Sequence, residues 1–214
     1  MNPEIPKRSF FNFAWQCPYR GVPPVIDGDL QDWDRRYQVP DLMELEGREA
    51  FADVYAAWSE RGLYFAANVR KAAGANVDRR RPLRGDGLQI WLDTRNVRNA
   101  HRASRYCHHF YFLPATGRAK PRAGQTRIRR ARAQSGMSES SALPVACDAS
   151  GTGYRLEVHL PAKSLTGFDP EENRLLGFTY LLQDRRQGRQ SWTADEPLPV
   201  SYDPSLWGTV ELVK

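Results

Sequence analysis

The most reactive side chains of the sequence lie in one short run, Cys107-His108-His109, with His101 a few residues before it. Thiolate and imidazole groups bind transition metals and serve as nucleophiles or bases. Because alternate residues of a strand share a face, Cys107 and His109 would lie together and His108 would face the other way. No further cysteine or histidine stands at metal-ligand spacing, and the three cysteines contain no CxxC pair. We therefore predict no metal site at this run and no disulfide framework.

Other catalytic and cofactor patterns are missing from the sequence. It contains no nucleophile elbow, no phosphate-binding loop and no recognisable pair of catalytic carboxylates. We therefore predict that the chain is not an enzyme. Haem is not expected either, since the methionines fall outside the predicted strands and there is no Cys-x-x-Cys-His. No cofactor is predicted, although Asp27, Asp93 and Asp184 could contribute to a calcium site, a question that the sequence leaves open.

Charge is distributed unevenly along the 214 residues, whose formal net charge is +6. Residues 70–132 contain 17 Lys or Arg and three acidic residues, a local balance of +14. One interpretation is that these are solvated, arginine-rich loops; the other is a surface that binds an acidic partner, either a polyanion or a protein. No nucleic-acid-binding motif accompanies the charge, so nucleic acid is not the expected partner. The candidate contacts to an acidic partner are Arg79, Arg80, Arg81, Arg127, Arg129 and Arg130.

Membrane and secretion signals are not visible. No stretch approaches the roughly 20 apolar residues that a membrane-spanning helix needs. The first 13 residues contain prolines and an acid rather than an uninterrupted apolar segment. We therefore expect a cytoplasmic protein with reduced cysteines.

The elements that must position these residues are mostly strands. Apolar and polar residues alternate with a period of two in five segments, and residues 176–183 form a more continuously apolar run that is typical of a central strand. No long segment has the helical period of 3.6. Short helical turns are predicted within Asp41–Ala50 and Pro161–Leu165. This pattern indicates an all-β protein, a single antiparallel β-sandwich with few short helical turns. The predicted strands are residues 53–58, 63–70, 88–93, 107–113, 154–160, 176–183 and 209–213.

The domain organisation follows from the same reading. Residues 1–21 are predicted to be an N-terminal extension that packs on the domain, and residues 22–214 are predicted to form the sandwich. Thr116–Met137 has the least regular pattern. We expect it to form a solvent-facing edge strand around Arg127–Arg132, with disordered flanks.

Six short patterns in a fixed order resemble the family 9 carbohydrate-binding modules and the wider DOMON-like sandwiches. Each pattern alone is an ordinary strand or turn, but their order and spacing span nearly the whole chain. They are Val25-Ile-Asp-Gly-Asp-Leu-Gln-Asp-Trp33, Trp58 with Leu63-Tyr-Phe65, Gly85-Asp-Gly-Leu-Gln-Ile-Trp-Leu-Asp93, Gly153-Tyr-Arg-Leu-Glu157, Leu176-Gly-Phe178 running to Asp184, and Asp203-Pro-Ser-Leu-Trp-Gly-Thr-Val-Glu-Leu212.

The resemblance implies non-catalytic binding of the end of a glycan chain between two tryptophans, with charged and amide groups holding the hydroxyls. Trp91 and Trp192 are the candidate stacking platforms, since both indoles are expected to be exposed. The polar candidates have outward-facing parity on their strands. They are Gln89, Arg155, Glu157, His159 and Gln183.

The sequence departs from the family pattern at two points. Family members usually have a glutamate where Gln89 stands. The tryptophan that clamps the sugar just before that position is replaced here by Arg79-Arg-Arg-Pro-Leu-Arg84. The fold can persist with another ligand, so binding of an acidic partner remains the alternative to binding of a neutral sugar.

Overall fold

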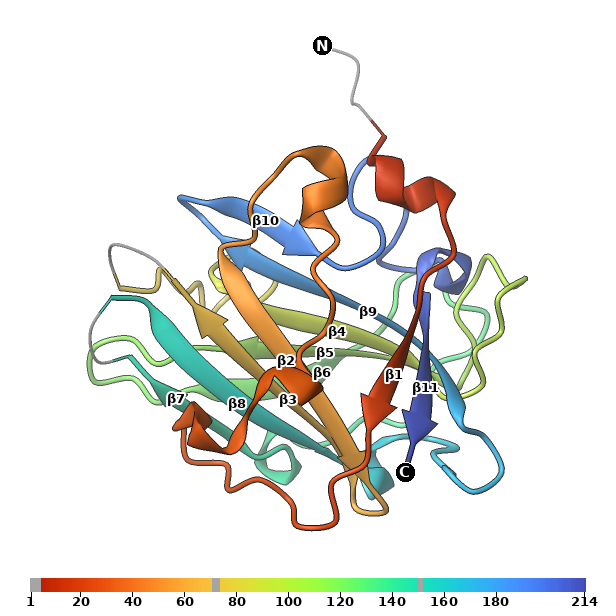
Figure 1. The fold of residues 1–214 in the computed structure, drawn as a ribbon, viewed down its shortest axis with the longest axis horizontal. Coiled ribbons are helices and arrows are strands. Elements are labelled where there is room, and N and C mark those ends of the chain that lie inside the picture. The colour runs from red at the N-terminus through yellow and green to blue at the C-terminus, as the bar shows by residue number, and fades with distance from the viewer. Residues whose placement is uncertain (1–4, 71–73, 150–151) are drawn as a thin grey trace.

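The computed structural model describes residues 5–70, 74–149 and 152–214. Two β-sheets pack face to face, with the smaller sheet in front in Figure 1. The larger sheet has the order β1 (Ala14–Pro18), β11 (Gly208–Val213), β9 (Leu175–Asp184), β4 (Gly87–Asp93), β5 (Cys107–Leu113) and β6 (Arg122–Thr126), and β10 (Gly188–Ser191) also pairs with β9. The smaller sheet has the order β2 (Ala52–Ser59), β3 (Gly62–Val69), β8 (Tyr154–Pro161) and β7 (Val145–Asp148).

Strand pairing is antiparallel throughout these sheets apart from β1, which runs parallel to β11. The prediction of an antiparallel β-sandwich is therefore confirmed. Alternate residues of the strands point into the core between the sheets. On β4, for example, Leu88, Ile90 and Leu92 enter the core between the sheets, whereas Gln89 and Trp91 point to the outer face of the larger sheet.

Helical structure among the described residues is limited to single 3₁₀ turns. The turns predicted within Asp41–Ala50 and Pro161–Leu165 are present as η4 and η6. No described helix has the length and apolar character needed to cross a membrane. The turns are η1 (Lys7–Phe10), η2 (Leu30–Asp32), η3 (Arg35–Tyr37), η4 (Met43–Glu46), η5 (Ser140–Ala142), η6 (Ala162–Ser164) and η7 (Pro204–Leu206).

The N-terminal segment contributes a strand to the larger sheet of the sandwich. β1 is hydrogen-bonded along β11, and Cys17 of β1 lies in the core. Ahead of β1, the fully buried Arg8 forms an ion pair with Glu46 at 2.9 Å and donates a hydrogen bond to Ser191 Oγ at 2.7 Å. The predicted boundary after residue 21 therefore does not separate the sandwich from an appended segment.

Three short strands were not predicted, and one predicted strand lies elsewhere. β1, β7 and β10 have five residues or fewer, too few to show a clear alternation. The edge strand expected around Arg127–Arg132 lies earlier, at β6, where Ala123, Gly124 and Gln125 are buried against β5. The arginine-rich residues that follow β6 form a turn rather than a strand.

Candidate functional site

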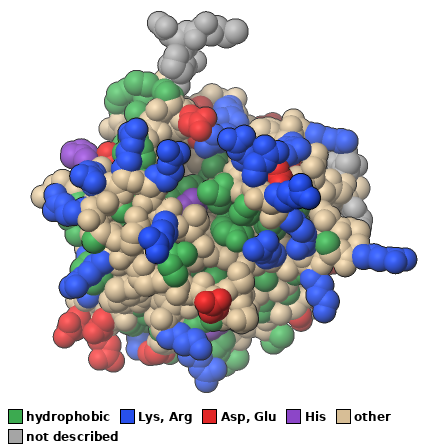
Figure 2. Space-filling model, turned by 180° about the vertical axis from the view of Figure 1, so that it is seen from behind, with side chains coloured by type: hydrophobic (Ala, Val, Ile, Leu, Met, Phe, Trp, Pro, Cys, Tyr) green, Lys and Arg blue, Asp and Glu red, His purple; other side chains and the backbone are tan. Residues whose placement is uncertain are grey.

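A pocket of about 590 Å³ lies on the outer face of the larger sheet. In Figure 2, which shows this face, the surface is hollowed and hydrophobic side chains are visible inside the hollow. The floor comes from β4, β5 and β9, and the walls come from the loops that precede β4 and follow β6 and β10. This volume lies within the usual range for small-molecule sites, about 300–1,000 Å³.

Strand register brings the floor residues together. On β4, Gln89 pairs with Leu181 of β9, and Trp91 pairs with His109 of β5. Gln183, two residues after Leu181, therefore shares the same face. These five side chains form a floor that combines apolar surface with amide and imidazole groups.

Trp91 lies beneath the pocket rather than projecting into it. Its indole stacks on the His109 ring with centroids 4.1 Å apart, and its Nε1 donates to the Ser201 carbonyl at 3.2 Å. Only 2% of Trp91 is exposed. The indole therefore supports the floor but presents little of its face to a ligand.

His109 is a neutral group in this site. Burial lowers the pKa of His109 from 6.5 to about 3. Its Nε2 lies 3.0 Å from Gln89 Oε1, so a neutral ring protonated at Nε2 donates to this oxygen. The hydrogen bond fixes the Gln89 amide plane at the centre of the floor.

The rim of the pocket is rich in arginine. Arg84, Arg127 and Arg129 are exposed and line it, together with Arg189 and Glu196. Arg189 forms ion pairs with Glu196 at 2.9 Å and with Asp195 at 2.8 Å. The loop that carries Arg84 is held to the floor because Gln183 Nε2 donates to the Arg84 carbonyl at 3.0 Å.

Of the seven predicted ligand-binding residues, the pocket brings together Gln89, Trp91 and Gln183. Trp192 is not among them. It is 1% exposed and packs in the sandwich core, with its ring centroid 5.3 Å from that of Phe178. The expectation that Trp192 is an exposed platform is therefore wrong. It comes directly after β10 and lies two residues from the buried Gln190, so strand alternation turns it inward.

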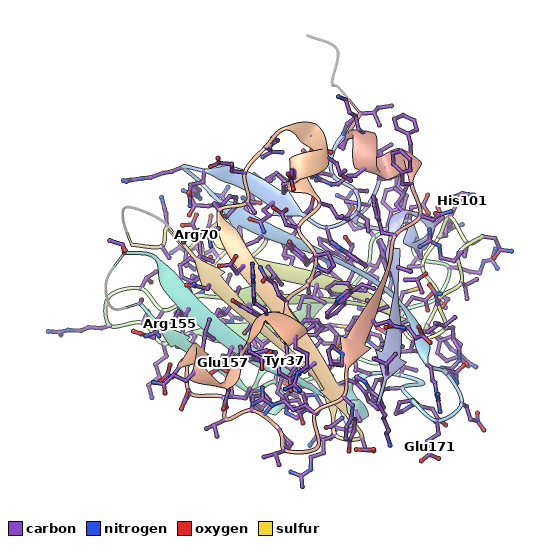
Figure 3. The ribbon with its side chains drawn as sticks, viewed as in Figure 1. Tyr37, Arg70, His101, Arg155, Glu157 and Glu171 are labelled. Atoms are coloured by element: carbon purple, nitrogen blue, oxygen red, sulfur yellow. The ribbon has the colours of Figure 1, made fainter. Side chains whose placement is uncertain are left out.

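Arg155, Glu157 and His159 are also outside the pocket, because all three lie on β8 in the smaller sheet. Figure 3 shows Arg155 and Glu157 on this front sheet, on the opposite side of the sandwich from the pocket. Arg155 pairs with Asp148 and, at 3.5 Å, with Asp29. These three residues therefore do not join Trp91 in one site.

On the outer face of the smaller sheet, Glu157 is covered and His159 is half-buried. Glu157 is fully buried and accepts hydrogen bonds from Trp33 Nε1 at 2.7 Å and from the Gly28 backbone N–H at 2.8 Å. His159 stacks on Tyr64 with centroids 4.5 Å apart. The N-terminal turn around Gly28 folds over this face. Glu157 therefore points away from the core, as its place on the strand predicts, but it is buried under this turn and does not face a ligand.

The arginines predicted to hold an acidic partner are divided by the structure. Arg127 and Arg129 line the pocket. Arg81 pairs with Asp78 at 2.9 Å, and Arg79 donates to the Lys120 carbonyl. Arg130 lies over the Tyr202 ring, with its guanidinium carbon 5.2 Å from the centroid. Arg80 does not line the pocket, so two of the six predicted arginines belong to it.

The reactive residues do not form a metal centre in the described part of the chain. No group of three or more His, Cys, Asp or Glu side chains there could hold a metal ion. Asp93 and Asp184 end the antiparallel strands β4 and β9 and so lie at opposite ends of this pair. The strand alternation predicted for the Cys107-His108-His109 run is present, since Cys107 packs with Trp91 while His108 Nδ1 lies 3.3 Å from Gln125 Nε2.

One serine, histidine and aspartate do meet at the surface. Ser205 Oγ lies 3.1 Å and Asp203 Oδ2 lies 3.2 Å from the same atom, His101 Nδ1. A nucleophilic relay needs the serine and the carboxylate on different ring nitrogens. This cluster therefore lacks the arrangement of a catalytic triad.

Sequence reasoning missed several residues of the pocket. His109 has a sequence signal, because it lies on the same strand face as Cys107 and pairs with Trp91 once the two strands are aligned. Arg84 lies in the arginine run already noted. Leu198 and Val200 come from the loop after β10 and show no periodic pattern, so only the folded chain places them at the pocket.

Comparisons with known proteins agree with this architecture. A family model described as "Carbohydrate family 9 binding domain-like" matches residues 26–214. The structure is similar to that of a family 9 carbohydrate binding module from Caldicellulosiruptor kristjanssonii in complex with cellotriose. The TM-score is 0.64 at 18% identity, covering 94% of this chain and 93% of that one. A structure from the same organism in complex with glucose gives a TM-score of 0.62 at 17% identity, covering 94% and 96% of the two chains. A search of curated proteins found no match.

Proposed function

Because the chain belongs to the carbohydrate family 9 binding domain-like family, we propose that it binds a glycan in the pocket on the outer face of its larger sheet. The observation that carries this proposal is the combination of groups in that pocket. Amide, imidazole and guanidinium groups surround apolar side chains on one concave surface. Sugars need both kinds of contact, because their C–H faces are apolar and their hydroxyls require directed hydrogen bonds.

The binding mode differs from a clamp of two indoles. Trp192 is in the core and Trp91 is almost covered. The apolar contact therefore comes from Leu83, Leu181 and Leu198, which line the pocket. The hydroxyls would be held by Gln89, Gln183 and the arginines of the rim.

Binding without catalysis is part of this proposal. Glycoside hydrolysis typically needs two carboxyl groups on opposite sides of the scissile bond. Among the described residues that line the pocket, Glu196 is the one carboxylate, and Arg189 already pairs with it. A chain of this kind would attach to a glycan and leave it intact.

Calorimetric titration of the full chain with cellotriose and glucose tests the proposal. We expect saturable binding that the substitution Gln183→Ala weakens about fivefold, because one hydrogen bond is lost. The control is Gln31→Ala, since Gln31 is exposed in η2 and lies outside the pocket. If no sugar on an array of neutral and acidic glycans binds the folded chain, the proposal is wrong.

A further inference from the structure

Positive charge is in excess among the residues that line the pocket. Four arginines and one glutamate line it among the described residues. Arg189 lies between two acidic side chains and is neutralised by them. In the described part of the chain, Arg84, Arg127 and Arg129 form no ion pair with any carboxylate. Three positive charges at the rim therefore have no carboxylate partner among the described residues.

The floor under these arginines carries no charge that could offset them. Gln89 and Gln183 are amides, and His109 is neutral at pH 7 because burial lowers its pKa to about 3. The floor is also largely shielded from water, with Gln89 6% and Leu181 5% exposed. An anion in this hollow would meet positive potential from several sides, with weaker solvent screening than on a flat surface.

The fold fixes the backbone that carries these three exposed arginines. Arg127 and Arg129 flank Ile128, which is 3% exposed and packs in the same cluster as Trp91 and Leu181. The backbone at Arg84 is held by the hydrogen bond that Gln183 donates to the Arg84 carbonyl. Figure 2 shows several basic side chains beside the hollow, and others elsewhere on this face.

We propose that the glycan bound here is anionic and that Arg84, Arg127 and Arg129 bind a carboxylate carried by its terminal sugar. This inference rests on the proposed function and narrows its ligand to the uronate class. A guanidinium group matches a carboxylate with two parallel N–H···O bonds, a geometry that a sugar hydroxyl cannot offer. The uncharged amides below remain available for the hydroxyls of the same ring.

The test compares glucuronate with glucose, which differ by a carboxylate in place of the C6 alcohol. We expect the full chain to bind glucuronate about tenfold more tightly than glucose at about 20 mM salt. This ratio should fall at about 500 mM salt, where exposed charges are screened. The double substitution Arg127→Gln and Arg129→Gln should remove most of the preference, because it lowers the affinity for glucuronate much more than the affinity for glucose. Arg35→Gln, an exposed arginine of η3 outside the pocket, is the matched control and should retain the preference.

Each alternative result has a defined meaning. Equal affinity for glucuronate and glucose overturns the anionic inference but leaves glycan binding intact. If the chain binds neither sugar and no glycan on the array, the proposed function itself is wrong. Tighter binding of glucose 6-sulfate than of glucuronate contradicts the carboxylate assignment. Duplex DNA that competes as strongly as glucuronate shows that the arginines bind polyanions in general, and this also overturns the inference. Persistence of the preference in the double variant overturns the assigned contacts.

Discussion

His109 and Glu157 show how burial sets the protonation of polar residues on the outer faces of the two sheets. Both have outward parity, and both are covered by other parts of the chain. Burial lowers the pKa of His109 to about 3 and raises the pKa of Glu157, although the hydrogen bonds from Trp33 and Gly28 oppose the latter shift. His109 contributes a neutral ring to the pocket, whereas Glu157 ties the N-terminal turn to β8.

The depressed pKa of His109 predicts a loss of stability in acid. The unfolded chain takes up a proton near pH 6.5, whereas folded His109 does so only near pH 3. Between these values the unfolded state binds more protons, so the free energy of unfolding falls as the pH decreases. In the unmodified protein, His109 should lower the free energy of unfolding by on the order of 3 kcal/mol between pH 6.5 and pH 4. We expect His109→Gln to remove this part of the pH dependence. Urea unfolding at several pH values measures this effect.

The control for this experiment is His101→Gln, because His101 is exposed at the surface (Figure 3). This variant should keep the slope of the unmodified protein. An unchanged slope in His109→Gln would show that His109 is not the group that links folding to protons. His108 is also buried, and its pKa is lowered to about 4, so part of the slope should remain in the variant.

At the scale of the elements, the β2–β3 hairpin depends on one glycine at its turn. Ser59 pairs with Gly62 across a two-residue connection, and Gly62 has φ +132°. A Cβ at this position would lie 2.1 Å from the Leu160 carbonyl oxygen on β8. The hairpin and the neighbouring strand can therefore approach each other this closely only because Gly62 has no side chain.

We predict that Gly62→Ala destabilises the protein by about 2–4 kcal/mol, because the new methyl group displaces β8 and the backbone conformation becomes strained. Chemical unfolding measures the change in free energy. Gly188→Ala is the matched control, since Gly188 also has positive φ, +95°, but has open space around it. It should cost only about 1–2 kcal/mol from the backbone alone. Equal losses in the two variants would show that the contact with Leu160 is not the cause.

At the scale of the whole molecule, the N-terminal residues complete the larger sheet. β1 covers the edge of β11, and Cys17 occupies the core. Arg8 ties the segment before β1 to Glu46 and to Ser191. The family match begins at residue 26, but the folded unit begins well before it. The cytoplasmic location expected from the sequence stays a prediction.

A chain shortened to residues 22–214 should therefore be much less stable. We expect its midpoint of thermal unfolding to fall by at least about 10 °C, since an edge of β11 is uncovered and a core residue is lost. A chain that begins at Phe13 retains β1 but lacks the Arg8 contacts, so its midpoint should lie between the two. Circular dichroism during heating measures all three. An unchanged midpoint in the shortest chain would mean that β1 is dispensable.

The sequence alone determined the fold class, the longer strands and the family. Alternation of apolar and polar residues located β2, β3, β4, β5 and β8, because a strand that faces a core on one side must place its apolar residues two apart. A more continuously apolar run located β9, and the last strand, β11, was also predicted. The same alternation placed Gln89 and Trp91 on one face of β4. Their membership of one pocket with Gln183 follows from the register of β4 and β9.

Only the tertiary structure decided which outward residues face a ligand and which are covered. Parity gives the side of a strand, but the loop or turn that lies over that side comes from distant parts of the chain. The turn around Gly28 buries Glu157, and the inward alternation that follows the short strand β10 carries Trp192 into the core. Arg127 and Arg129 meet Arg84 at one rim because Ile128 packs beside Trp91. Such long-range packing leaves no periodic signal in the sequence, because each segment contributes only one or two residues to it.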